Sequence, residues 1–161
     1  MLNMFDDWLK QNNWNIKYNC KKEIALNPAF TNRYQVIDNE YMEFLKKYKA
    51  VMSKDDKVWF LCCDVYNDVA DLAFKWNEYE ILSLEAADDD DEWKSEIEQW
   101  WNGKMPIIMS VRDNYSFYAI DLNDKVGSIV RGEEPEFEET ELISNSFYEF
   151  LEKVVTNQIL L

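Results

Sequence analysis

Residues 104–124 read KMPIIMSVRDNYSFYAIDLND and bring together side chains of the types that enzymes use: Arg112, Asp113, Tyr115, Tyr118 and Asp121. Charged and tyrosine side chains that converge can act as general acids and bases, so the stretch is a candidate catalytic cluster. The same letters also read as strand, turn and strand, with a charged pair at the turn, which suits a hairpin in a binding module. Local chemistry leaves both interpretations open.

The composition removes the usual catalytic devices. The chain has no histidine, which excludes Ser-His-Asp and Cys-His nucleophile activation and the commonest metal ligand. Its three glycines form neither a GxGxxG motif nor a P-loop, and the run from Asp88 to Glu92 lacks the glycine of an EF-hand calcium loop. A hydrolase with two carboxylates stays open, although thirty-two acidic residues make any chosen pair uninformative. We therefore expect no enzyme, metal, cofactor or small-molecule substrate.

Negative charge is concentrated in the later part of the chain. The formal net charge is −15. Residues 1–60 hold ten Lys/Arg and eight Asp/Glu, a net of +2, whereas residues 61–161 hold seven and twenty-four, a net of −17. Such a surface repels nucleic acids and anionic membranes and attracts basic partners at long range. Acidic charge also keeps a small protein soluble, so charge alone does not decide between these roles.

Two acidic runs are the candidate contacts with a basic protein partner. Their carboxylates would pair with the Arg and Lys side chains that normally hold phosphates, with Trp or Tyr nearby as anchors. The structural alternative is a solvated helix start for the first run and a charged sheet edge for the second. The candidate residues are Asp88, Asp89, Asp90, Asp91 and Glu92 in the first run, and Glu133, Glu134, Glu136, Glu138, Glu139 and Glu141 in the second.

The cysteines and the N-terminus indicate a cytoplasmic protein. Cys20, Cys62 and Cys63 are odd in number and include two neighbours, so we interpret them as reduced thiols, with the neighbouring pair lying in a strand. The N-terminus has no basic segment before its apolar residues, and no apolar run is long enough to span a bilayer. We expect neither a secretory signal nor a membrane segment.

The spacing of apolar residues predicts one α+β domain over residues 1–161, with a central, mostly antiparallel sheet flanked by N-terminal, middle and C-terminal helices. Trp93, Ile97 and Trp100 or Trp101 should line the buried side of the middle helix. Residues 12–35 read as a loop with one short strand, and residues 71–85 as an extended segment with some helical character. Helices are expected over 2–11, 39–50, 88–102 and 145–161, and Ser146 or Asn145 should cap the last of them. Strands are expected over 57–66, 104–111, 116–122 and 126–134, with an acidic connector or edge strand over 135–144.

The candidate hairpin also has a structural reading. Asp113 and Asn114 suit its turn. Alternate residues of the strand that follows point to opposite faces, and both faces are mostly apolar, so the strand should be central and covered on both sides. Asp121 is then expected to accept N–H groups of the following NDKVG turn.

The second half of the chain resembles the SUKH superfamily, whose members include bacterial immunity proteins against secreted polymorphic toxins and a fungal regulator of cell-wall assembly. The shared pattern is a Pro-Ile strand start, an aromatic run that closes on Asp-Leu, and a final helix that opens Ser-Phe and continues to Phe-Leu. The stretch YQVIDNEYMEFLKKYKA looks like the first conserved helix, but Val36-Ile37 stands in place of Leu-Pro, Lys49-Ala50 in place of Asn-Gly, and RDNYS in place of a glycine-containing turn. The matching residues are Pro106, Ile107, Tyr118, Asp121, Leu122, Ser146, Phe147, Phe150 and Leu151.

The resemblance implies an α+β domain without catalytic activity. Immunity members bind a toxin stoichiometrically, often a nuclease with a basic substrate groove, and the acidic later part of this chain fits such a partner. The leading hypothesis is an immunity protein that neutralises a basic toxin. The alternative is an intracellular scaffold or regulator like the fungal member, and a third option is a carboxylate-dependent hydrolase acting on sugars.

Overall fold

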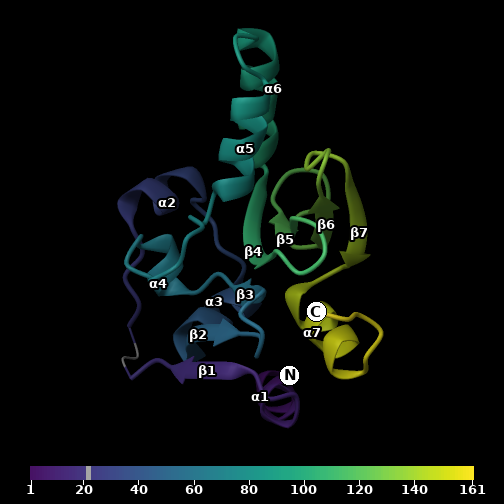
Figure 1. Cartoon of the computed structure of the whole chain (residues 1–161). Helices are drawn as coiled ribbons and strands as arrows, with labels where there is room; N and C mark the ends of the chain where they lie inside the picture. Colours follow the sequence, from purple (N-terminus) through teal and green to yellow (C-terminus); the bar gives the residue numbers. More distant parts are fainter. Residues whose placement is uncertain (21–22) are drawn as a thin grey trace.

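The computed structural model describes residues 1–20 and 23–161, which form one seven-stranded antiparallel sheet with helices on both faces (Figure 1). The strands lie in the order in which they occur along the chain. Within the described residues the helices are α1 (Leu2–Gln11), α2 (Pro28–Arg33), α3 (Asn39–Lys47), α4 (Cys63–Tyr66), α5 (Glu78–Ala86), α6 (Asp91–Asn102) and α7 (Phe147–Val155). The strands are β1 (Asn15–Tyr18), β2 (Tyr48–Met52), β3 (Val58–Phe60), β4 (Lys104–Ser110), β5 (Ser116–Asp121), β6 (Ile129–Glu133) and β7 (Thr140–Ser144). The predicted α+β fold is confirmed.

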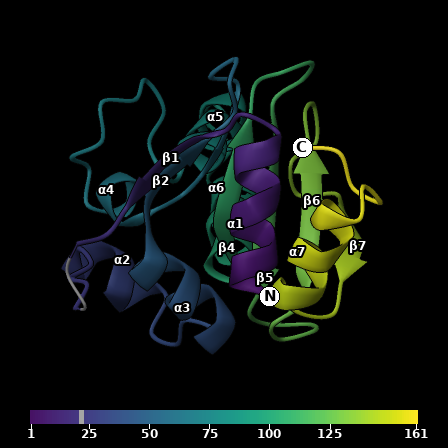
Figure 2. The ribbon, with the colours of Figure 1, turned by 90° about the horizontal axis from the view of Figure 1, so that it is seen from below.

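Aromatic side chains attach the helices to the two faces of the sheet. On one face, the Phe60 ring of β3 lies 5.1 Å from that of Phe44 in α3 and 5.5 Å from that of Phe5 in α1. On the other face, the Phe117 ring of β5 lies 4.9 Å from Trp101 in α6. Figure 2 shows α1 and α7 in front of the sheet, with α5 and α6 behind it. All of β5 is buried, which confirms the predicted central strand.

Several local predictions are wrong. Residues 71–85, which were expected to be mainly extended, include all of α5 except its last residue. The periodic signal of α5 is weak because Glu80, a charged residue, lies on its buried side against Arg33. The predicted loop over 12–35 contains α2, whose Asn27 cap and Pro28 at the first turn are recognisable start signals. Residues 21 and 22 of that loop lie outside the described residues.

The expected boundaries around β2 and β3 also need correction. The helix expected over 39–50 ends at Lys47, and β2 follows at once. The strand expected over 57–66 ends at Phe60, and α4 begins at Cys63, because a short apolar run fits a strand and a buried helix equally well. Cys62 and Cys63 are buried free thiols outside the strand. Burial raises the pKa of both thiols, that of Cys63 to about 11, so they stay protonated.

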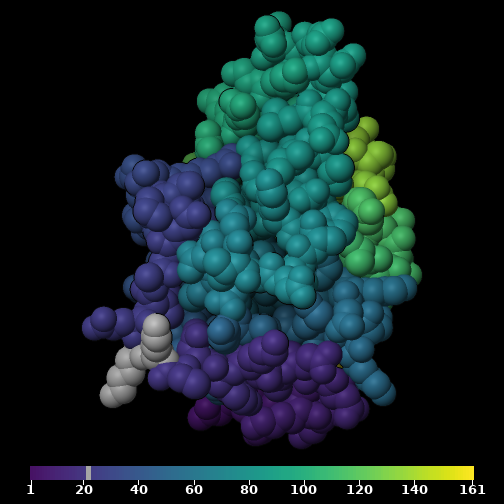
Figure 3. Space-filling view, turned by 60° about the vertical axis from the view of Figure 1, so that its left-hand side comes forward, coloured from purple at the N-terminus to yellow at the C-terminus, as the bar shows by residue number. Residues whose placement is uncertain are grey.

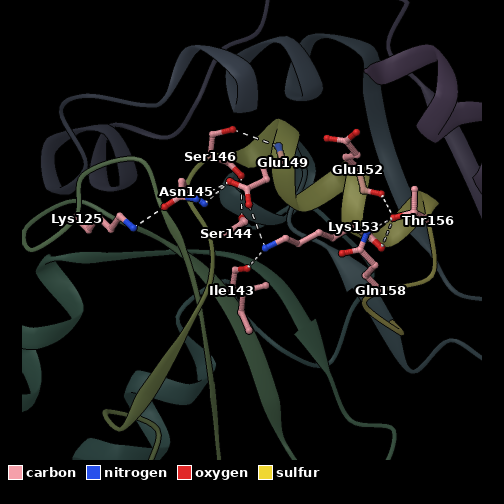
Figure 4. Close-up of polar contacts among 10 residues, drawn as sticks. All are labelled: Lys125, Ile143, Ser144, Asn145, Ser146, Glu149, Glu152, Lys153, Thr156 and Gln158. Atoms are coloured by element: carbon pink, nitrogen blue, oxygen red, sulfur yellow. Dashed lines mark hydrogen bonds and ion pairs between the residues drawn. The ribbon is translucent and has the colours of Figure 1, made fainter.

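The start of α7 is fixed by the predicted cap (Figure 4). Ser146 Oγ accepts the N–H of Glu149 at 3.2 Å. The Glu149 carboxylate accepts the Asn145 N–H at 2.8 Å, and this bond, with help from Lys153, lowers the pKa of Glu149 to about 2. Lys153 Nζ also donates to the carbonyl of Ile143 in β7 at 2.7 Å. These contacts tie the final helix to the last strand.

Among the helices of the described residues, none is both long enough and apolar enough to cross a membrane.

Candidate binding surface

The first acidic run occupies the tip of a helical hairpin formed by α5 and α6. This hairpin projects from the rest of the molecule, as Figures 1 and 3 show from two sides. The five carboxylates from Asp88 to Glu92 are exposed. Asp90 caps α6 by accepting the Trp93 N–H at 2.9 Å. The other four have no hydrogen-bond or ion-pair partner among the described residues, so their charges are available to a partner.

The base of this hairpin is held firmly. Arg33 of α2 donates two hydrogen bonds, of 2.6 and 2.7 Å, to the carboxylate of Glu80 in α5. The ring of Tyr79 stacks on Phe137 with a centroid distance of 4.8 Å, and its hydroxyl donates to the Ser110 carbonyl at 2.7 Å. The tip is therefore presented on an anchored support.

Trp93 lies beside the acidic tip and is 47% exposed. Its predicted burial was wrong, whereas Ile97 and Trp101 are buried as predicted. The packed part of α6 lies nearer its C-terminal end, so the first turn reaches beyond the body of the protein and its tryptophan remains in solvent. An exposed tryptophan within one helical turn of unpaired carboxylates is the combination expected of a binding anchor.

Most carboxylates of the second acidic run have partners within the fold. Glu133 and Glu141 pair with Arg131 at 2.6 and 3.6 Å. Glu134 accepts the Tyr115 N–H, and Glu138 accepts the indole N–H of Trp101 at 2.9 Å. The remaining two candidates are exposed and without a side-chain partner in the part of the chain that the structure describes; they are Glu136 and Glu139.

The five candidate catalytic residues of the hairpin do not all meet, although Arg112, Asp113 and Tyr118 line one pocket near the turn. Arg112 pairs with Asp55 at 2.9 Å, near the turn. Asp121 lies at the far end of β5, about 17 Å along the strand from Ser116 at a rise of roughly 3.4 Å per residue. There it accepts the N–H groups of Asn123, Asp124 and Lys125 at 2.9, 3.1 and 3.3 Å, as predicted.

Asp121 has a further partner that was not predicted. The Lys104 ammonium lies 3.1 Å from its carboxylate, and both residues are buried. Burial alone would raise the pKa of Asp121, but the Asn123 N–H and the Lys104 ammonium outweigh it, so the pKa lies below its ordinary value. Asp121 is therefore an ionised structural carboxylate at the end of the sheet.

The residues of the family pattern serve the packing of this same core. The Pro106 carbonyl accepts the Tyr66 hydroxyl at 2.7 Å, and the ring of Tyr118 lies 5.1 Å from that of Phe150. Ser146 caps α7, as described above. The others are buried or partly buried against the core; they are Ile107, Leu122, Phe147 and Leu151.

These observations define an α+β domain whose pattern residues build the sheet and its last helix. Six carboxylates of the two acidic runs are unpaired within the described residues, and four of these six lie on a projecting hairpin. The chain belongs to the SMI1 / KNR4 family (SUKH-1), whose family model matches residues 29–153. Membership supports a protein-binding module of the immunity-like or regulatory kind. Searches of curated proteins and of solved structures found no significant match.

Proposed function

We propose that the protein is a non-catalytic immunity protein that neutralises a basic, nuclease-type toxin by stoichiometric binding through its acidic surface. The observation that carries the proposal is the tip of the α5–α6 hairpin, where Asp88, Asp89, Asp91 and Glu92 are exposed and unpaired within the described residues. Glu136 and Glu139 add charge on the segment that packs against the hairpin base.

The physical argument concerns both the rate and the specificity of binding. Uncompensated carboxylates on a projecting support raise the local concentration of a basic partner and orient its approach. In contact, they would pair with arginine and lysine side chains that otherwise hold phosphates. Trp93 offers the apolar anchor that charges alone do not supply.

Growth rescue tests the function directly. Cells that express a basic nuclease toxin domain, sought first in the open reading frames next to this gene, should survive only when this protein is co-expressed, and the pair should co-purify in a 1:1 complex. A protein that binds a host signalling partner and gives no protection would instead support the regulatory alternative. Turnover of a polysaccharide that single Asp→Asn changes abolish would refute a non-catalytic role.

Neutralising the tip should slow association with the toxin. In the variant Asp88→Asn, Asp89→Asn, Asp91→Asn, Glu92→Gln, the association rate constant at low salt is expected to fall by about tenfold or more, because steering charge is lost. Stopped-flow mixing at several salt concentrations measures the rate constant and its salt dependence, which should become shallower.

A matched control removes the same charge elsewhere. Asp7→Asn, Glu23→Gln, Asp71→Asn and Glu152→Gln change four exposed residues outside the hairpin. This control should slow association less than the tip variant. Equal slowing by both variants would mean that net charge, and not the tip, directs the encounter.

A further inference from the structure

The last strand, β7, leaves one edge of the sheet open. It pairs with β6 and ends the strand order, and in Figures 1 and 2 no other helix or strand of the described residues lies along its outer side. Glu141 and Leu142 in this strand are exposed, Leu142 by 54%. An edge strand presents unpaired N–H and C=O groups to which another strand can bind.

The register identifies the residues that carry these free groups. Between β5 and β6, the N–H of Glu134 bonds to the Tyr115 carbonyl and the N–H of Asp121 to the Ser128 carbonyl, both at 2.9 Å. In an antiparallel ladder the backbone N–H and C=O groups of successive residues point to opposite sides of the strand. The backbone groups of Gly132 and Val130 therefore point towards β5, and those of Arg131 point towards β7.

Arg131 lies opposite Glu141, so the backbone of Glu141 is bonded inward to β6. Its neighbours Thr140 and Leu142 must direct their N–H and C=O groups outward. No hydrogen bond to these groups is found within the described residues. The next carbonyl, that of Ile143, is already bonded to Lys153 (Figure 4), which limits the free edge to the Thr140 end.

From this geometry we infer that the β7 edge binds an extended segment of the basic partner as an eighth strand, paired through the backbone of Thr140 and Leu142. The inference rests on the proposed function and names the contact by which the partner is held. In an antiparallel pairing, the residue opposite Glu141 belongs to a non-hydrogen-bonded pair, in which side chains lie closest. A lysine or arginine at that position pairs with Glu141, and an apolar residue beside it covers Leu142.

The charges favour a basic partner over a second copy of this chain. In the antiparallel register in which both copies use Thr140 and Leu142, each Glu141 would lie opposite the Glu141 of the other copy. Like charges directly opposite each other on a sheet are destabilising, and each chain carries a formal net charge of −15. Glu139, which is exposed and without a side-chain partner among the described residues, adds negative charge near the same end of the edge.

A cyclic β-hairpin peptide with Val-Lys-Thr in its outer strand is the probe, and the same hairpin with Val-Glu-Thr is its control. Amide hydrogen exchange by NMR on the full chain should slow by about tenfold at Thr140 and Leu142 when the lysine hairpin is bound. The Glu141 N–H, already bonded to β6, should change little, and the glutamate hairpin should have no effect. The inference is overturned if both hairpins have equal effects, or if the changes are confined to the α5–α6 tip. It is also overturned if amide exchange at Thr140 and Leu142 is already slow in the free protein at high concentration.

Proline substitutions test the same geometry without relying on the peptide alone. Thr140→Pro removes an outward N–H and should leave the urea midpoint of unfolding nearly unchanged, while it weakens hairpin binding by about tenfold. Glu141→Pro removes an inward N–H and should lower the midpoint clearly. If Thr140→Pro is the more destabilising of the two, the assignment of the free edge is wrong. A last outcome separates the edge contact from the proposed function. If the wild-type protein protects cells from the toxin, but amide exchange at Thr140 and Leu142 is not slowed in the toxin complex, the edge contact is wrong and the proposed function stands.

Discussion

Replacing Asp121 by alanine is expected to lower the free energy of unfolding by about 3 kcal/mol, because it removes the buried counter-charge of Lys104 and leaves the ammonium paired only with the exposed carboxylate of Asp124, 3.1 Å away. Lys104 and Asp121 are 5% and 4% exposed, and their charged atoms are 3.1 Å apart. Alanine also removes the acceptor for the N–H groups of Asn123 and Asp124. Urea denaturation followed by tryptophan fluorescence measures the loss.

Two further variants separate the charge from the hydrogen bonds. Asp121→Asn keeps an oxygen for the turn but loses the charge, so it should still be strongly destabilised. Adding Lys104→Met removes the buried ammonium, which Asp124 alone would otherwise neutralise, and should recover most of that loss, since buried ion pairs replaced by apolar groups are often nearly neutral. A double variant as unstable as Asp121→Asn would show that the ion pair is not the cause.

The same pair predicts a pH dependence of known sign. The pKa of Asp121 in the folded protein lies below its ordinary value, so its stabilising contribution is present above the unfolded pKa and is lost as pH falls through the folded one. The difference in stability between wild type and Asp121→Asn should therefore be largest near neutral pH and shrink below about pH 4. A difference that stays constant down to pH 3 would contradict this assignment.

Features that depend on residues close in sequence could be predicted. Ser146 caps α7 through an N–H three residues later, and the apolar face of that helix is visible in the spacing of Phe147, Phe150 and Leu151. Asp121 receives the N–H groups of the turn that directly follows it. In each case the partner lies within four residues, so the sequence displays the whole interaction.

Features that depend on distant pairing could not be predicted. In the pairing of β4 with β5, Ser110 lies opposite Ser116, and a regular register from that pair would place Lys104 opposite Leu122. A β-bulge between Pro106 and Ile108 shifts the register by one residue and places Lys104 opposite Asp121. Partners of the second acidic run are equally hidden. Nothing in the sequence distinguishes Glu138, which accepts the Trp101 indole, from Glu139, which remains free among the described residues.

Replacing Phe147 by alanine is expected to lower the free energy of unfolding by about 3–5 kcal/mol, the range for removing a fully buried aromatic side chain. Phe147 is 0% exposed, and its ring lies 5.0 Å from Tyr41 and 5.4 Å from Phe44, both in α3. The cavity would open between the first and last helices of the family pattern. Urea denaturation measures the loss, and growth protection by the variant should fail at raised temperature before it fails at low temperature.

The surroundings of Phe147 indicate that this cavity would close only in part. Tyr41 is held by its hydroxyl, which donates to the Leu61 carbonyl at 2.6 Å and whose oxygen lies 2.8 Å from the Tyr66 hydroxyl oxygen. The Glu40 carboxylate accepts the Tyr148 N–H at 2.7 Å, which fixes the distance between α3 and α7. Because neither helix is free to move inward, Phe147→Leu, which retains most of the volume, should lose only about 1 kcal/mol. Equal losses in the alanine and leucine variants would mean that the aromatic contacts with Tyr41 and Phe44, and not the filled volume, hold the final helix in place.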